Sequence, residues 1–180
     1  MQQPELVTYS GFTACGLALQ TSDAIEAQAV TARVPLLWRR FYSEAVPARL
    51  SANAANGRVV CVYSGFENGG AGAYTVTAGV QLIRDHGCPN GLVRAAVSSG
   101  EYLRFTTYGA GQSAIAQTWQ QIREFFANPE HTLAGRFERA FTADFERYGD
   151  PDSVSVFIAV KRKLGVHRAA EHLRRALRPV

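Results

Sequence analysis

The stretch Asp144-Phe145-Glu146-Arg147-Tyr148 places a carboxylate among aromatic side chains, shortly before the strand-like run 153–160. An ionised carboxylate resists burial unless a cation or hydrogen-bond donors meet it. Glu146 is therefore expected to face a cleft and to meet a cationic or amphiphilic small molecule there. The alternative is that Glu146 is a solvated surface residue at a strand end, paired with Arg147 or Arg139.

The run 153–160 alternates in the manner of a strand with two different faces. Val154, Val156, Ile158 and Val160 fall on one face, and Ser155, Phe157 and Ala159 fall on the other. If helices cover the valine face, Phe157 faces the cleft.

Hydrophobic periodicity extends this pattern along the chain. It predicts strands over 6–18, 58–66, 74–83, 92–97, 101–108 and 153–160, and helices over 25–41 and 113–126. Pro35 interrupts the first helical pattern, because proline removes a helix hydrogen bond. That helix is expected either to kink at Pro35 or to begin again near Val34.

When 92–97 and 101–108 count as one interrupted strand, and the mixed segment 137–145 that leads to Glu146 counts as another, the order strand, helix, strand, strand occurs twice. Trp38 and Trp119 occupy equivalent points, as do Phe66-Glu67 and Phe145-Glu146. This pattern predicts an α+β fold built as a tandem βαββ repeat with pseudo-twofold symmetry, with antiparallel sheets, helices on one side and a central cleft. Glu67 precedes a glycine-rich turn, so we expect it to be exposed and Glu146 to be the acid kept for a ligand.

Charge divides the chain into a body and a tail. Residues 161–180 hold seven basic residues and one acid, which leaves 12 basic and 14 acidic residues in 1–160. The slightly acidic body argues against direct DNA binding. We expect one domain over 1–163, with halves at about 4–87 and 90–163, and a basic amphipathic helix over 164–180. The helix is expected to dock on the body. Alternatives are a homodimer contact, contact with a regulator or an acidic partner, or contact with an anionic surface.

Several other classes of site and location are not supported by the sequence. Cys15, Cys61 and Cys88 are odd in number and widely spaced, which argues against disulfides and against thiolate zinc sites. The histidines lack metal-ligand spacing, and the glycine-rich run 68–72 lacks the residues of a phosphate loop. We therefore expect no metal or cofactor. Without an apolar run of membrane-spanning length or a signal peptide, a cytoplasmic protein is the simplest expectation.

A set of short motifs occurs in a fixed order along the chain. They are Leu37-Trp38-x-x-Phe41, Val62-Tyr63-Ser64-Gly65-Phe66-Glu67, Gly72-x-Tyr74-x-Val76-x-x-Gly79, Ser99-Gly100-x-Tyr102-x-x-Phe105, the Trp119 helix and Asp144-Phe145-Glu146-x-Tyr148. Together they resemble the gyrase-inhibitor-like (GyrI-like) effector-binding family over nearly all of residues 4–162. That family includes ligand domains of MerR-type regulators, AraC-type relatives and stand-alone proteins, some found in integron cassettes.

The resemblance implies the tandem βαββ fold and an aromatic cleft whose acid meets cationic, lipophilic drugs. That role falls on Glu146 in this sequence. The candidate ligand-binding residues are Glu146, Trp38, Tyr63, Tyr102, Phe105, Tyr148 and Phe157. Trp38 is expected either in the cleft or in the core, whereas Trp119 is expected mainly in the core because its helix neighbours are apolar.

Three functions remain open from the sequence. The first is a stand-alone binding protein for amphiphilic, cationic small molecules. The second, which some proteins resembling this family imply, is a hydrolase of strained cyclopropane natural products in which Glu146 acts as general base. The third is a module that contacts gyrase or a regulatory partner.

Overall fold

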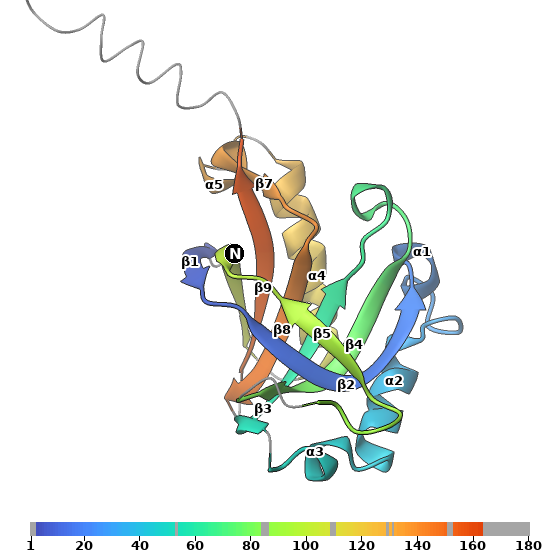
Figure 1. Ribbon diagram of the computed structural model, residues 1–180. Coiled ribbons are helices and arrows are strands. Elements are labelled where there is room, and N and C mark those ends of the chain that lie inside the picture. Colours follow the sequence, from blue (N-terminus) through green and yellow to red (C-terminus); the bar gives the residue numbers. More distant parts are fainter. Residues whose placement is uncertain are drawn as a thin grey trace, which may run out of the picture.

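Alternating β-branched and aromatic residues form one curved antiparallel sheet in the computed structural model, which describes residues 3–52, 54–83, 87–108, 111–128, 130, 132–150 and 153–163 (Figure 1). The strands are β1 (Glu5–Tyr9), β2 (Phe12–Thr21), β3 (Ala54–Ser64), β4 (Tyr74–Leu82), β5 (Val93–Val97), β6 (Gly100–Tyr108), β7 (Phe137–Arg139), β8 (Ala143–Asp150) and β9 (Ser153–Arg162). The helices are α1 (Asp23–Glu26), α2 (Val34–Ser43), α3 (Val46–Arg49), α4 (Gln112–Ala127) and α5 (Thr132–Arg136), with a 3₁₀ turn η1 (Asn68–Gly70). The expected α+β class is confirmed.

The sheet order places β3 and β8 side by side at its centre. The strands pair in the order β1-β6-β9-β8-β3-β4-β2-β5, and β7 also pairs with β9. Read outward from the β3–β8 pair, the order is β3-β4-β2 on one side and β8-β9-β6 on the other, as two βαββ units would give. The expected residue match differs, because Phe145-Glu146 lies inside β8 whereas Phe66-Glu67 lies beyond the end of β3. The repeat itself stays a prediction.

The single strand expected over 6–18 is divided at Gly11. Its backbone has a φ of 77°, in the left-handed region that favours glycine. A Cβ atom at Gly11 would also lie 2.8 Å from the backbone nitrogen of Ser99 and the carbonyl oxygen of Val97. The chain can therefore turn sharply, so that β1 pairs with β6 and β2 pairs with β4 and β5.

The helix expected over 25–41 is two helices, and the restart near Val34 is confirmed. The Glu26 carboxylate accepts hydrogen bonds from the backbone nitrogens of Arg33 at 3.0 Å and Val34 at 3.3 Å. This contact satisfies donors that the first turn of α2 leaves free. Pro35 lies in that same first turn, where its missing N–H costs nothing.

Both major helices cover one face of the sheet. Ala78, Cys61, Glu146 and Val156 are successive partners across β4, β3, β8 and β9, so their side chains point to the same face. At the β4 end, Leu37 and Phe41 of α2 pack over this face, and at the β9 end Ile122 and Phe125 of α4 do so. Figure 1 shows α4 behind β8 and β9, with α2 beside β4.

An aromatic cluster fills the opposite face, where the sheet curls on itself. Phe145 and Phe157 stack with ring centroids 4.5 Å apart, and Tyr9 and Tyr102 pack edge-on against them. Val60 and Val62 of β3 complete the cluster. This face is therefore a second core, and the space between the halves lies on the helix side.

The expectation that the cysteines form no disulfide is wrong. Cys15 on β2 and Cys88 form a disulfide across 73 residues of sequence, with Cα atoms 5.9 Å apart. The reason is topological, because β2 pairs with β5 and the segment leading into β5 folds back over Cys15. Cys61 is a buried free thiol.

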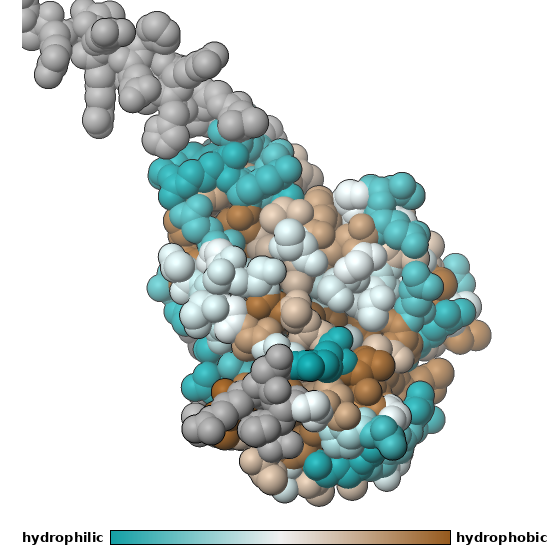
Figure 2. Space-filling view, in the orientation of Figure 1, coloured by the Kyte–Doolittle hydropathy of each residue, from teal (hydrophilic) through white to brown (hydrophobic). Residues whose placement is uncertain are grey.

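Exposed ion pairs mark the end of the molecule that carries β7, including Lys161–Glu138 and Arg162–Glu101. Figure 2 shows hydrophilic residues gathered at this end. Among the described residues, no helix has the length and apolar character needed to cross a membrane. The expected tail helix over 164–180 and all four histidines lie outside the described residues, and the division at 163 stays a prediction.

Candidate functional site

A cavity of about 550 Å³ opens on the helix side of the sheet, between α1–α2 and α4. Its floor comes from β3 and β8, the pair at the junction of the two sheet halves, and from the neighbouring strand β4. Its walls are mostly aromatic and aliphatic, with a few charged groups. The lining residues are Asp23, Glu26, Ala27, Ala32, Val34, Pro35, Trp38, Tyr63, Phe66, Gly70, Tyr74, Ile115, Ala116, Trp119, Arg123, Arg139, Glu146 and Tyr148.

Glu146 occupies the floor of this cavity and is 1% exposed. Its Oε1 atom accepts hydrogen bonds from the Trp119 indole nitrogen at 2.6 Å and from the Tyr63 hydroxyl at 2.8 Å. Its Oε2 atom accepts a hydrogen bond from the Tyr148 hydroxyl. The donors come from α4, β3 and β8, so three elements hold one carboxylate. All three donors are neutral.

Burial dominates the electrostatics of the Glu146 carboxyl. Desolvation raises its pKa above the ordinary glutamate value of 4.5, although the hydrogen bonds from Tyr148, Trp119 and Tyr63 act in the opposite direction. Burial and the nearby carboxylate also raise the pKa of the Tyr148 and Tyr63 hydroxyls, so these groups remain donors. Within the part of the chain that the structure describes, no cation forms an ion pair with Glu146.

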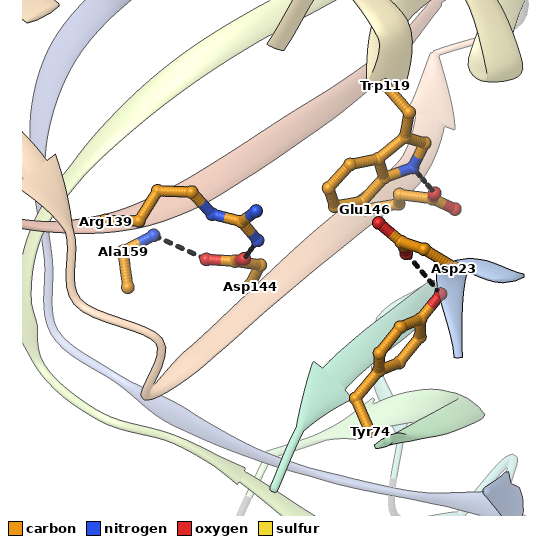
Figure 3. Close-up of polar contacts among 7 residues, drawn as sticks. All are labelled: Asp23, Tyr74, Trp119, Arg139, Asp144, Glu146 and Ala159. Carbon is orange, nitrogen blue, oxygen red and sulfur yellow. Dashed lines mark hydrogen bonds and ion pairs between the residues drawn. The ribbon is translucent and has the colours of Figure 1, made fainter. Parts of the chain in front are cut away.

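Asp144 lies two residues earlier on the same face of β8 and is also buried. Its Oδ2 atom accepts a hydrogen bond from Arg139 Nη2 at 2.5 Å, and its Oδ1 atom accepts one from the Ala159 backbone nitrogen at 2.8 Å. Burial raises the pKa of Asp144, and Arg139 and Ala159 oppose that rise. Figure 3 shows this ion pair beside the Trp119–Glu146 hydrogen bond.

Aromatic rings hold the Arg139 side chain in place. Its guanidinium carbon lies 4.5 Å from the centroid of the Phe141 ring and 5.7 Å from that of Phe66. Such cation–π contacts fix the arginine against Asp144. The positive charge of Arg139 is thus committed to a protein carboxylate, even though Arg139 lines the cavity.

A second polar contact lies on the α1 side of the cavity. The Tyr74 hydroxyl donates a hydrogen bond to Asp23 Oδ1 at 3.0 Å, as Figure 3 shows. Both carboxylate oxygens of Glu26 accept hydrogen bonds. Oε1 accepts from the Thr21 hydroxyl at 2.6 Å, and both oxygens accept from backbone nitrogens at the start of α2. These acids are therefore held in place by local hydrogen bonds.

The structure brings together four of the residues expected at the cleft, namely Glu146, Trp38, Tyr63 and Tyr148. The rings of Trp38 and Tyr148 meet edge-to-face at 5.1 Å, so Trp38 belongs to the wall as well as to the α2 core. Glu67 is exposed, as expected, and accepts a hydrogen bond from the Ala73 backbone nitrogen at 3.4 Å.

Tyr102, Phe105 and Phe157 do not line the cavity. Tyr102 and Phe157 lie in the aromatic cluster on the opposite face, where the Tyr102 hydroxyl donates to the Ser98 carbonyl at 2.8 Å. Phe105 lies under α4, with its ring centroid 5.5 Å from that of Phe125. The cleft was expected on the face of β9 opposite to the valines, but it lies on the valine side, between the two helices.

Sequence reasoning missed Trp119 as a cavity residue and placed it in the core. The available signal was chemical, because a buried indole N–H needs an acceptor. Phe66, Tyr74 and Arg139 were also missed, and Arg139 was considered only as a partner of Glu146. No local pattern marks these residues, since strand pairing and side-chain direction bring them together.

Comparison with known proteins agrees with the fold and with the resemblance to GyrI-like effector-binding proteins. YobU, a candidate transcriptional regulator protein of Bacillus subtilis (strain 168), is 27% identical over 154 residues, covering 82% of this chain and 91% of YobU. The integron cassette protein VCH_CASS2 of Vibrio cholerae is 28% identical, with a TM-score of 0.74 over 89% of this chain and 97% of that one.

A third protein, SAV2435, was solved bound to tetraphenylphosphonium. It shares 17% identity and has a TM-score of 0.71 over 95% of this chain and 99% of its own, which shows a common fold. The family model described as "Cass2: Integron-associated effector binding protein" matches residues 5–160. This chain therefore belongs to the Cass2 family of integron-associated effector binding proteins.

Proposed function

We propose that the protein binds lipophilic organic cations in the cavity above Glu146. One observation carries this proposal: Glu146 is a buried carboxylate that has three neutral hydrogen-bond donors and no cationic partner among the described residues, and it lines a cavity of about 550 Å³. A buried charge without a partner is costly. A ligand cation would supply the missing opposite charge.

The aromatic walls favour a cation with a large apolar surface. Trp38, Tyr63 and Trp119 stand around Glu146, and each ring that faces a cation contributes about 0.5–2 kcal/mol. The cavity volume lies within the range of about 300–1,000 Å³ typical of small-molecule sites. SAV2435, which has the same fold, is bound to a ligand of this class, tetraphenylphosphonium.

The hydrogen bonds at Glu146 favour a cation that has no N–H groups of its own. Both carboxylate oxygens already accept hydrogen bonds from the protein, so the carboxylate does not need a ligand donor. A primary ammonium would bring N–H groups into a largely apolar cavity, where unpaired donors are costly. Quaternary and charge-delocalised cations avoid that cost.

The same hydrogen bonds favour binding over hydrolysis. A general base must direct a free lone pair at the water it activates. Oε1 of Glu146 already accepts from Trp119 and Tyr63, and Oε2 accepts from Tyr148, so only about one of the four acceptor sites of the carboxylate is left for a water. The hydrolase alternative would be supported by catalytic turnover of a cyclopropane electrophile that Glu146→Gln abolishes. The gyrase-contact or regulator-contact alternative stays a prediction.

The proposed function is tested with two ions of the same shape and opposite charge. Tetraphenylphosphonium and tetraphenylborate present the same four phenyl rings. Calorimetric titration of the wild-type protein should show saturable 1:1 binding of tetraphenylphosphonium and much weaker binding of tetraphenylborate. Equal affinity for both ions, or tighter binding of tetraphenylborate, would overturn the proposal.

A further inference from the structure

An arginine in the cavity wall has no part in holding a simple cation. Arg123 lies on α4 one turn after Trp119, so both side chains project from the same side of the helix, and both line the cavity. Arg123 is exposed and makes no hydrogen bond or ion pair with another described residue. A positive charge at this point repels a ligand that carries only positive charge.

The other charged groups of the cavity have local partners. Arg139 is paired with Asp144, and Glu26 accepts hydrogen bonds at the N-terminus of α2. Asp23 accepts a hydrogen bond from Tyr74. Arg123 lies near enough to that hydroxyl for its charge to oppose the rise in the Tyr74 pKa that burial and Asp23 cause. Arg123 therefore faces the Asp23 side of the cavity without being engaged there.

We propose that the natural ligands are amphoteric, with an aromatic cation above Glu146 and a carboxylate or similar acidic group that Arg123 meets at α4. This inference rests on the proposed function, since it adds a second recognition point to the same cavity. Glu146 selects the cationic end and Arg123 selects the acidic end, and the aromatic walls between them accept the flat body of the molecule.

Arg123 acts here as a specificity-determining residue. A ligand carboxylate in this cavity would otherwise meet the like charges of Asp23, Glu26 and Glu146. Specificity depends on a difference between affinities, so a cation that lacks the acidic group gains nothing from Arg123 and is repelled by it. Because Arg123 is exposed, its contribution should be that of a solvent-accessible ion pair, about two- to five-fold in affinity.

The test uses a rhodamine dye with a free carboxylate and the ethyl ester of the same dye. Both contain the same aromatic cation, and only the free acid offers an anionic group at pH 7.5. Fluorescence anisotropy titrations give the ratio of the two affinities. Arg123→Gln should lower the preference for the acid over the ester by about two- to five-fold. The matched control is Arg39→Gln, on the exposed surface of α2 and outside the cavity, which should leave the ratio unchanged.

A second variant tests the sign of the effect. Asp23→Asn removes a negative charge from the cavity and should raise the preference for the acid. The inference would be overturned if the ratio of acid to ester affinity did not change in Arg123→Gln, or changed equally in Arg39→Gln. In that case both dyes would still bind, and the proposed function would stand. If neither dye binds the wild-type protein, both proposals are contradicted.

Discussion

Asp144 and Glu146 lie two residues apart on the same face of β8, and both are buried, yet they differ in what meets them. Asp144 has a protein counter-ion, Arg139, and a backbone donor, Ala159. Glu146 has three neutral donors, and no ion pair within the described part of the chain. Asp144 also connects β8 to β9 through Ala159, whereas Glu146 lines an open space.

This difference supports a structural role for Asp144 and the proposed ligand-binding role for Glu146. A buried carboxylate whose charge is compensated inside the protein contributes to the fold and offers little to a ligand. A carboxylate that is held in place by neutral donors keeps its position and its negative charge available. We infer that the donors around Glu146 keep it oriented when the cavity is empty.

The largest expected effect comes from breaking the Asp144 ion pair. Arg139→Leu leaves Asp144 buried without its counter-ion, which should lower the free energy of unfolding by about 3–5 kcal/mol. Denaturant unfolding monitored by circular dichroism measures this change. Arg147→Leu is the matched control, because Arg147 also lies on β8 and makes a cation–π contact with Phe157, at 5.2 Å, but forms no ion pair with another described residue.

Losses of equal size in the two arginine variants would show that Asp144 does not depend on a counter-ion. The comparison between Asp144 and Glu146 would then fail. Glu146→Gln, in contrast, should change the free energy of unfolding by only about 1 kcal/mol, because the amide oxygen can still accept hydrogen bonds from Trp119 and Tyr63.

The next effect is a dependence of ligand binding on pH. Burial raises the pKa of Glu146 in the folded protein, so the ionised carboxylate lowers the free energy of unfolding. This loss of stability is absent below pH 4.5, where the carboxyl is protonated in both the folded and the unfolded protein. It is complete only above the raised pKa. A cation binds the ionised form. Affinity for tetraphenylphosphonium should therefore increase about ten-fold as the pH rises through the raised pKa, with release of a proton.

Titration calorimetry in two buffers of different ionisation enthalpy measures the released proton. Glu146→Gln should remove both the pH dependence and the proton release. If the same pH dependence remains in Glu146→Gln, a group other than Glu146 controls binding.

A smaller effect separates the two tryptophans in the wall. Trp119→Phe removes a hydrogen bond to Glu146, whereas Trp38→Phe removes aromatic surface alone, since Trp38 makes ring contacts with Tyr148 and Phe41. Loss of one charge-assisted hydrogen bond should weaken tetraphenylphosphonium binding about ten-fold in Trp119→Phe, against about three-fold in Trp38→Phe. The reverse order would show that stacking, not the position of the carboxylate, dominates.

The sequence predicts much of the sheet because its signals are local. The alternation of Val154, Val156, Ile158 and Val160 places β9, and the stripe over 113–126 places α4. Glu146 and Tyr148 were also identified, since a carboxylate among aromatic residues is unusual in any context, whereas Tyr63 was identified through the motifs that resemble the GyrI-like family. These predictions rest on short-range patterns that packing then preserves.

Features that depend on long-range pairing were not predictable in the same way. The Cys15–Cys88 disulfide follows from the pairing of β2 with β5, and the side of the sheet on which the cavity lies follows from where α2 and α4 pack. Trp119 meets Glu146 because α4 crosses above β8, 27 residues away in sequence. Spacing along the chain carries none of this information.

The most direct test compares tetraphenylphosphonium and tetraphenylborate in the wild-type protein, in Glu146→Gln and in Glu67→Gln. Glu67 is the exposed acid that follows a phenylalanine in the first half of the chain, so its variant controls for loss of one negative charge. Glu146→Gln should weaken the affinity for tetraphenylphosphonium at least about ten-fold and reduce the difference in affinity between the two ions. Glu67→Gln should bind both ions as the wild-type protein does. Wild-type affinity for tetraphenylphosphonium in a folded Glu146→Gln protein would contradict the central claim.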